Sequence, residues 1–173
     1  VFLVVGRPAA LHSARGLATQ LNASSTSPLR FHLVTDAPEP SDWASGYSLG
    51  SMPAEALALH RNFSQLTHGP GAVYMWKPLL HWLLPLDRAI IIDSDVLVVA
   101  DLAELWRRFN SFGETQVLGL ANEQAPMYAG LPRRGFNGGV QLAHLHRMRR
   151  AGSVYGAQLR AAASGGYGHI GYL

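Results

Sequence analysis

Two carboxylates one residue apart, Asp93 and Asp95, directly follow the apolar run AIII in the segment AIIIDSDVLVVADLAELW, Ala89 to Trp106. In an extended segment, residues two apart point to the same side, so both carboxylates can face one ligand. Without a cation they would repel each other, and one would tend to take up a proton. Oxygen ligands suit Mn²⁺ or Mg²⁺, which could then hold a diphosphate. The alternative is that both aspartates cap turns at a strand end and face water.

A second group of candidates is the segment FNGGV, in which Asn137 precedes Gly138 and Gly139. The two glycines lack side chains and therefore allow a ligand to approach the backbone closely. The segment is therefore a candidate for contact with a ligand. The alternative is an asparagine in a glycine turn.

Three further positions are candidates for contact with a ligand. Lys77, in YMWKPLL, is the only lysine of the chain, and it precedes a helix-like segment. It is a candidate contact for a bound ligand, or else a lysine on the surface. Gly6 and Arg7 follow the first apolar run, where α/β folds commonly hold a nucleotide, although Gly-Arg-Pro also suits a simple turn.

Alternating strand-like and helix-like patterns must position these residues. Short apolar or β-branched runs predict strands at 1–5, 29–36 and 89–93, and helical spacing predicts helices at 11–21, 51–63 and from 102 onward. Asp101, with Glu104 three residues later, predicts the start of the last helix. The run VLVV at 96–99 reads as a brief extended segment after the aspartates. The alternation predicts an α/β fold, whose ligands bind where strands end.

Composition narrows the class of protein. A chain of 173 residues with 48% hydrophobic and 14% charged residues predicts one globular domain. A net charge of +3 is mild evidence for anionic ligands and only weak evidence for nucleic acid, so no nucleic-acid partner is predicted. The absence of cysteine excludes disulfides, zinc–thiolate sites and thiol catalysis. The basic cluster from Arg147 to Arg150 is interpreted as a solvated helix face.

The motif LLPLDRAIIIDSDVLVVADLAELW resembles glycosyltransferase family 8, whose signature combines Leu-Pro before a strand, Asp-x-Asp, and Asp-Leu-x-Glu-Leu-Trp. The later segment GFNGGVQLAHLHRMR is similar to the family's Phe-Asn-x-Gly-Val motif, with Gly138 where relatives often carry serine or alanine. The segment FHLVTD resembles the family's second strand. The resemblance extends from about Val1 to Arg149 and is closest in wording to the LARGE-like and xylosyltransferase branches.

The resemblance implies a GT-A fold, Rossmann-like with a mostly parallel sheet, and a retaining transfer from a UDP-sugar to a hydroxyl of a glycan or glycoprotein. Asp95 would ligate Mn²⁺ or Mg²⁺, Asp93 would lie near the ribose and the metal, and the backbone of Ser94 would lie near the nucleotide. Asn137 would lie beside the transferred sugar or the acceptor, and Lys77 would reach the donor. The implied location is the Golgi lumen, with a membrane anchor outside this chain, or the cytoplasm if the protein is bacterial.

The resemblance also implies that residues 1–173 are a single catalytic domain that is incomplete at its C-terminal end. The family's Gly-Asp-Gln segment and distal histidine, which supply the group nearest the reacting carbon and the third metal ligand, are expected beyond residue 173. Two alternatives stay open from the motifs. One is a haloacid-dehalogenase-like phosphatase with Asp93 as nucleophile, and the other is a non-catalytic sugar- or nucleotide-binding relative.

Overall fold

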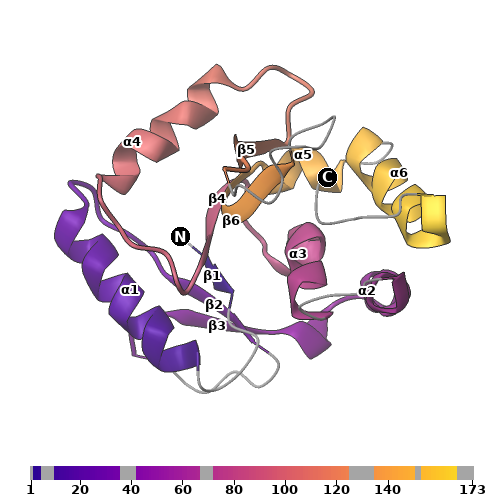
Figure 1. Cartoon of the computed structure of the whole chain (residues 1–173), viewed down its shortest axis with the longest axis horizontal. Helices are drawn as coiled ribbons and strands as arrows, with labels where there is room; N and C mark the ends of the chain where they lie inside the picture. The colour runs from indigo at the N-terminus through magenta and orange to yellow at the C-terminus, as the bar shows by residue number, and fades with distance from the viewer. Residues whose placement is uncertain are drawn as a thin grey trace.

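A computed structural model describes residues 2–4, 10–35, 42–66, 72–124, 135–150 and 153–166. In this part of the chain one sheet has the strand order β3-β2-β1-β4-β6-β5 (Figure 1). Strands β1 to β4 pair in parallel, and β6 is antiparallel to both β4 and β5. The predicted α/β fold with a mostly parallel sheet is confirmed. The strands are β1 (Phe2–Val4), β2 (His32–Thr35), β3 (Ser45–Ser48), β4 (Ala89–Asp93), β5 (Leu118–Asn122) and β6 (Phe136–Ala143).

Helices cover both faces of the sheet. One face carries α1 (Ala10–Ser24) and α4 (Leu102–Arg107), the latter continued by the 3₁₀ turn η3 (Arg108–Ser111). The other face carries α2 (Ala54–Leu66), the 3₁₀ helix η2 (Ala72–Leu79), α3 (Leu80–Leu83), α5 (Leu145–Arg149) and α6 (Val154–Ala161). Two short turns, η1 (Leu49–Ser51) and η5 (Ala162–Gly166), complete these elements. None of the described helices is long and apolar enough to cross a lipid bilayer.

Strand β4 lies in the middle of the sheet and shows why its sequence is continuously apolar. Ile90 and Ile92 pack in the core under α1 and α4, whereas Ile91 packs in the core under α2 and α3. Successive side chains of a strand point to opposite faces, so a strand covered on both sides has no solvated position. By the same alternation, Asp93 lies on the face of Ile91.

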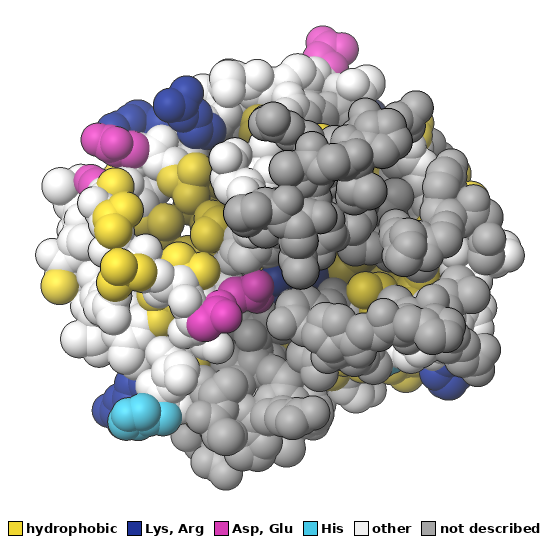
Figure 2. All heavy atoms as spheres, in the orientation of Figure 1, with side chains coloured by type: hydrophobic (Ala, Val, Ile, Leu, Met, Phe, Trp, Pro, Cys, Tyr) yellow, Lys and Arg dark blue, Asp and Glu magenta, His cyan; other side chains and the backbone are white. Residues whose placement is uncertain are grey.

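The segment after β4 differs from the sequence prediction. Residues 96–99 form no strand, although Val96 and Val98 pack against the core under α1. Leu97 and Val99 point outward and are 73% and 86% exposed. Figure 2 shows hydrophobic side chains gathered on the left of the molecule. In the same orientation, Figure 1 places α1, α4 and the segment joining β4 to α4 there. Helix α4 then begins as predicted, because the Asp101 carboxylate accepts a hydrogen bond of 2.9 Å from the Ala103 amide.

The basic cluster in α5 is more than the solvated face that the sequence predicted. The Arg149 guanidinium donates hydrogen bonds to the carbonyls of His81, Leu84 and Leu86, at 3.1, 2.7 and 2.6 Å. Arg147 donates to the carbonyls of Gly113 and Gln116. These carbonyls belong to the last turn of α3 and to the connections that precede β4 and β5, and the two arginines donate the hydrogen bonds that such carbonyls need. Arg149 and Arg150 are exposed and Arg147 is half-buried, so the solvated face was predicted correctly but the backbone contacts of Arg147 and Arg149 were not.

Candidate functional site

The candidate site lies where the order of the parallel strands reverses. Strand β2 follows β1 on one side, whereas β4 pairs with the other side of β1, with Asp93 opposite Val4. Ligands of open α/β sheets bind in the crevice at such a reversal, outside the carboxyl ends of the strands. Because β6 runs antiparallel to β4, its first residues lie at the same edge. The sheet therefore brings together Asp93 and the Asn137–Gly139 segment, which the sequence analysis named as separate candidates.

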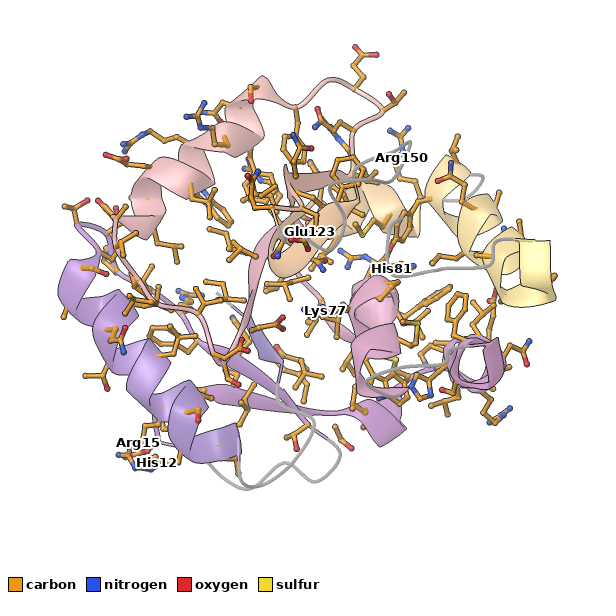
Figure 3. All side chains as sticks on the ribbon, viewed as in Figure 1. His12, Arg15, Lys77, His81, Glu123 and Arg150 are labelled. Atoms are coloured by element: carbon orange, nitrogen blue, oxygen red, sulfur yellow. The ribbon has the colours of Figure 1, made fainter. Side chains whose placement is uncertain are left out.

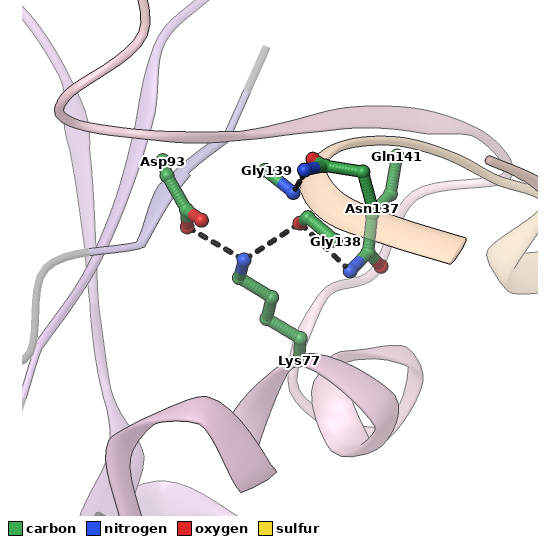
Figure 4. A network of polar contacts seen from close by, with 6 residues as sticks. All are labelled: Lys77, Asp93, Asn137, Gly138, Gly139 and Gln141. Carbon is green, nitrogen blue, oxygen red and sulfur yellow. Dashed lines mark hydrogen bonds and ion pairs between the residues drawn. The ribbon is translucent and has the colours of Figure 1, made fainter. Parts of the chain in front are cut away.

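Lys77 joins these two segments (Figure 4). Its Nζ lies 2.6 Å from Oδ1 of Asp93 and donates a hydrogen bond of 2.8 Å to the Gly138 carbonyl. The same carbonyl accepts a bond of 3.1 Å from the Gln141 side chain. The Lys77 side chain comes from η2, on the face of Ile91, and is 7% exposed, whereas the side chain of Asp93 is 24% exposed. The alternative of a surface lysine is therefore wrong.

Asn137 is held at both ends of its amide group. Its Oδ1 accepts a hydrogen bond of 2.9 Å from the Gly139 amide, and its Nδ2 donates to Oε2 of Glu123 at 3.4 Å. A side chain on Gly139 would stand in this place, because a Cβ there would lie 3.1 Å from Oδ1 of Asn137 and 3.8 Å from Oδ2 of Asp93. The absent side chain of Gly139 thus lets the side chains of Asn137 and Asp93 both lie close to its backbone.

Glu123 is a site residue that the sequence analysis missed. It follows β5 directly, and its amide donates to the Gly135 carbonyl at 2.8 Å, next to the start of β6. Figure 3 shows Glu123 and Lys77 in the middle of the molecule, whereas His12 and Arg15 lie at its outer edge. The signal that could have found it is topological, because the end of β5 lies beside the start of β6 only if the two strands are antiparallel.

The electrostatics of Asp93 combine one expected and one unexpected effect. Burial raises its pKa, Lys77 opposes this shift, and the nearby Asp95 carboxylate adds to it. The sequence predicted the repulsion between the two aspartates. It did not predict that the chain itself supplies a cation, since Lys77 was assigned only to the donor.

The remaining predicted residues lie around this network or outside the described part. Ser94 and Asp95 form the turn after β4, with Asp95 exposed and Ser94 half-buried. Gly6 and Arg7 lie outside the described residues. Within the described ranges, no group of three or more His, Cys, Asp or Glu side chains could hold a metal. The two aspartates nevertheless form a hard oxygen donor set whose members sense each other's charge, which fits a divalent cation completed by ligands from a bound diphosphate or water.

Sequence comparison finds relatives among the LARGE proteins. The chain is 32% identical over 145 residues to human "Xylosyl- and glucuronyltransferase LARGE2", which covers 72% of this chain and 20% of that protein. It is 33% identical over 143 residues to chicken "Xylosyl- and glucuronyltransferase LARGE1", covering 71% and 19%. The chain thus spans about a fifth of the length of these curated relatives. No protein-family model matches it.

Solved structures share the architecture at lower sequence identity. Mouse xyloside xylosyltransferase 1, in its apo form, superposes with a TM-score of 0.74 at 17% identity, covering 95% of this chain and 73% of that one. The galactosyltransferase LgtC superposes with a TM-score of 0.61 at 16% identity, covering 92% and 64%. These two structures support the fold, and the LARGE proteins support the family. The chain therefore has the GT-A fold and belongs to glycosyltransferase family 8, in its LARGE-like branch.

Proposed function

We propose that this chain is the donor-binding part of a UDP-sugar-dependent glycosyltransferase, which transfers a sugar to a hydroxyl of a glycan or glycoprotein with retention of configuration. The observation that carries the proposal is the position of Asp93 and Asp95 at the end of a central parallel strand, where the strand order reverses. Lys77 and Asn137 reach the same point from η2 and β6. A carboxylate pair, an ammonium and an exposed amide suit a donor that carries both phosphates and hydroxyls.

Asp93 and Asp95 would hold the divalent cation, Mn²⁺ or Mg²⁺. Asp95 is exposed and directly accessible, whereas Asp93 is half-buried beside Lys77. When bound, the cation would stabilise the charge that develops on the departing diphosphate. The protein's own contribution is to fix the two carboxylates at the strand end and to offer the Lys77 ammonium to the same anion.

The printed names of the relatives suggest the first donors to test. Human LARGE2 and chicken LARGE1 are named as xylosyl- and glucuronyltransferases, so UDP-xylose and UDP-glucuronate are proposed as candidates for this chain. The Gly138 and Gly139 backbone, with Asn137, would contact the sugar or acceptor, and the Ser94 backbone, Gly6 and Arg7 would contact the nucleotide. We also propose one catalytic domain whose reacting-carbon group lies beyond residue 173, and a Golgi-lumenal location with an anchor outside this chain.

The phosphatase alternative is not favoured, because the relatives are named as transferases and Asp93 is paired with Lys77. The two reactions are separable by experiment. A phosphatase forms an aspartyl-phosphate at Asp93 and releases phosphate from simple monoesters, whereas a transferase needs no such bond. A non-catalytic relative would bind UDP without turning over any UDP-sugar.

The test incubates the full-length protein, with Mn²⁺, separately with a panel of UDP-sugars and with p-nitrophenyl phosphate. We expect UDP release from at least one UDP-sugar, loss of UDP binding on adding EDTA, and loss of both in Asp95→Asn with little change in thermal unfolding. UDP binding that is independent of metal would remove the metal role. Phosphate release from the monoester that is lost in Asp93→Asn, with no turnover of any UDP-sugar, would instead establish the phosphatase.

A further inference from the structure

The Lys77 ammonium lies beside the Asp93 carboxylate, which the proposed cation needs as a ligand. The ammonium lies 2.6 Å from Oδ1 of Asp93 and also bonds the Gly138 carbonyl (Figure 4). The whole residue is only 8% exposed. A buried ammonium is stable only when it is paired and hydrogen-bonded, and Lys77 meets this condition through Asp93.

This pairing changes the charge that an arriving cation meets. The ammonium balances the Asp93 carboxylate, so the exposed Asp95 carries the net negative charge of the turn. A divalent ion that approached both aspartates would be repelled by the ammonium and would compete with it for Asp93. If the ion displaced the ammonium, this buried positive charge would lose its bond to the Asp93 carboxylate, which is unfavourable.

A nucleoside diphosphate resolves this conflict. Its negative charges can neutralise the cation at the aspartates and can also give the displaced ammonium a new partner. The side chain of lysine is long and flexible, so it can change partners without a movement of η2.

We propose that Lys77 occupies Asp93 in the ligand-free protein, and that a divalent cation and a nucleoside diphosphate therefore bind this site as a coupled pair, the diphosphate taking over the Lys77 ammonium. This inference rests on the proposed function. The coupling is reciprocal. UDP must strengthen cation binding by the same factor by which the cation strengthens UDP binding. Lys77 is then a positioning residue whose removal weakens the coupling between the two binding events.

The first experiment measures Mn²⁺ affinity with and without UDP, by titration calorimetry, for the wild type, Lys77→Met and Lys77→Arg. Methionine keeps most of the apolar stem and removes the charge, whereas arginine keeps the charge and is the matched control. We expect Lys77→Met to bind Mn²⁺ alone on the order of tenfold more tightly than wild type, because the competing charge is gone. The strengthening by UDP should shrink by at least a similar factor, and Lys77→Arg should retain the wild-type coupling.

The second experiment does not use Lys77→Met and so remains decisive if that variant fails to fold. In NMR spectra of ¹³C,¹⁵N-lysine-labelled protein, the Lys77 side-chain signal is identified as the one that is missing from Lys77→Arg. We expect this signal to move when diamagnetic Mg²⁺ and UDP are added together, and to move little with Mg²⁺ alone.

Two outcomes would overturn the inference while leaving the proposed function intact. One is unchanged Mn²⁺ affinity in Lys77→Met together with weaker UDP binding, which would make Lys77 a contact of the nucleotide only. The other is a lysine signal that stays in place when Mg²⁺ and UDP bind. By contrast, wild-type protein whose UDP binding ignores the metal would contradict the proposed function itself.

Discussion

Replacing Gly139 by alanine tests the close approach on which the site depends. A Cβ at this position would lie 3.1 Å from Oδ1 of Asn137, which is closer than carbon and oxygen normally pack. Asn137 is exposed and can rotate away, but its bond of 2.9 Å from the Gly139 amide is then lost. One such hydrogen bond contributes about 1 kcal/mol, and the change from glycine to alanine returns about 0.4–1 kcal/mol by restricting the unfolded chain. We therefore expect the unfolding free energy to change little.

Binding should respond far more than stability. Without its orienting bond, Asn137 no longer presents its amide in a fixed direction, and we expect the affinity for a UDP-sugar to fall about tenfold. The matched control is Gly16→Ala, in α1 and outside the candidate site, where a Cβ would meet nothing within 4 Å. Urea unfolding and calorimetric titration with UDP-xylose and UDP measure both quantities. Wild-type affinity in Gly139→Ala, or an equal loss in Gly16→Ala, would refute the reasoning.

Two further predictions concern stability. Arg149→Ala leaves three carbonyls without their donor and should cost about 2 kcal/mol in urea unfolding, whereas Arg150→Ala, at an exposed neighbour, should cost less than about 0.5 kcal/mol; equal costs would show that the carbonyl bonds contribute nothing. Burial lowers the pKa of His81 to about 4, so the unfolded chain binds a proton as pH falls below 6.5 while the folded chain does not. Stability should therefore fall from pH 6.5 towards pH 4, and His81→Gln should remove about 3 kcal/mol of that loss in unfolding curves measured across this range; an unchanged pH dependence in His81→Gln would contradict the assignment.

The sequence predicted the parts of the fold that depend on local pattern. The four apolar residues before Asp93 and the Asp101 cap each determine their own element, so β4 and α4 formed where expected. The strand expected at 96–99 did not form. Its β-branched residues favour a strand, but strand formation needs a neighbour, and the described β1 residues pair with β4 only as far as Asp93.

The candidate site was predictable residue by residue but not as a network. Asp93 and Asn137 each stood out because of their motif. The pairing of Lys77 with Asp93 depends on a 3₁₀ helix that lies over the Ile91 face of the sheet. The spacing of residues in the sequence does not predict that Lys77 and Asp93 lie close together. Glu123 was missed because its position depends on the antiparallel direction of β6, which local pattern cannot distinguish from parallel.

The antiparallel strand β6 has a consequence for how the site is assembled. The pairing of β1 with β4 spans all the chain that contains β2, β3, α2 and α3, and β6 must then dock against β4. Contacts between residues so far apart in sequence form slowly, because the intervening chain must first be ordered. During synthesis Lys77 and Asp93 emerge before the segment that provides the Gly138 carbonyl and Asn137. The network at the strand ends is therefore complete only in the finished fold, so donor binding would report on folding as well as on function.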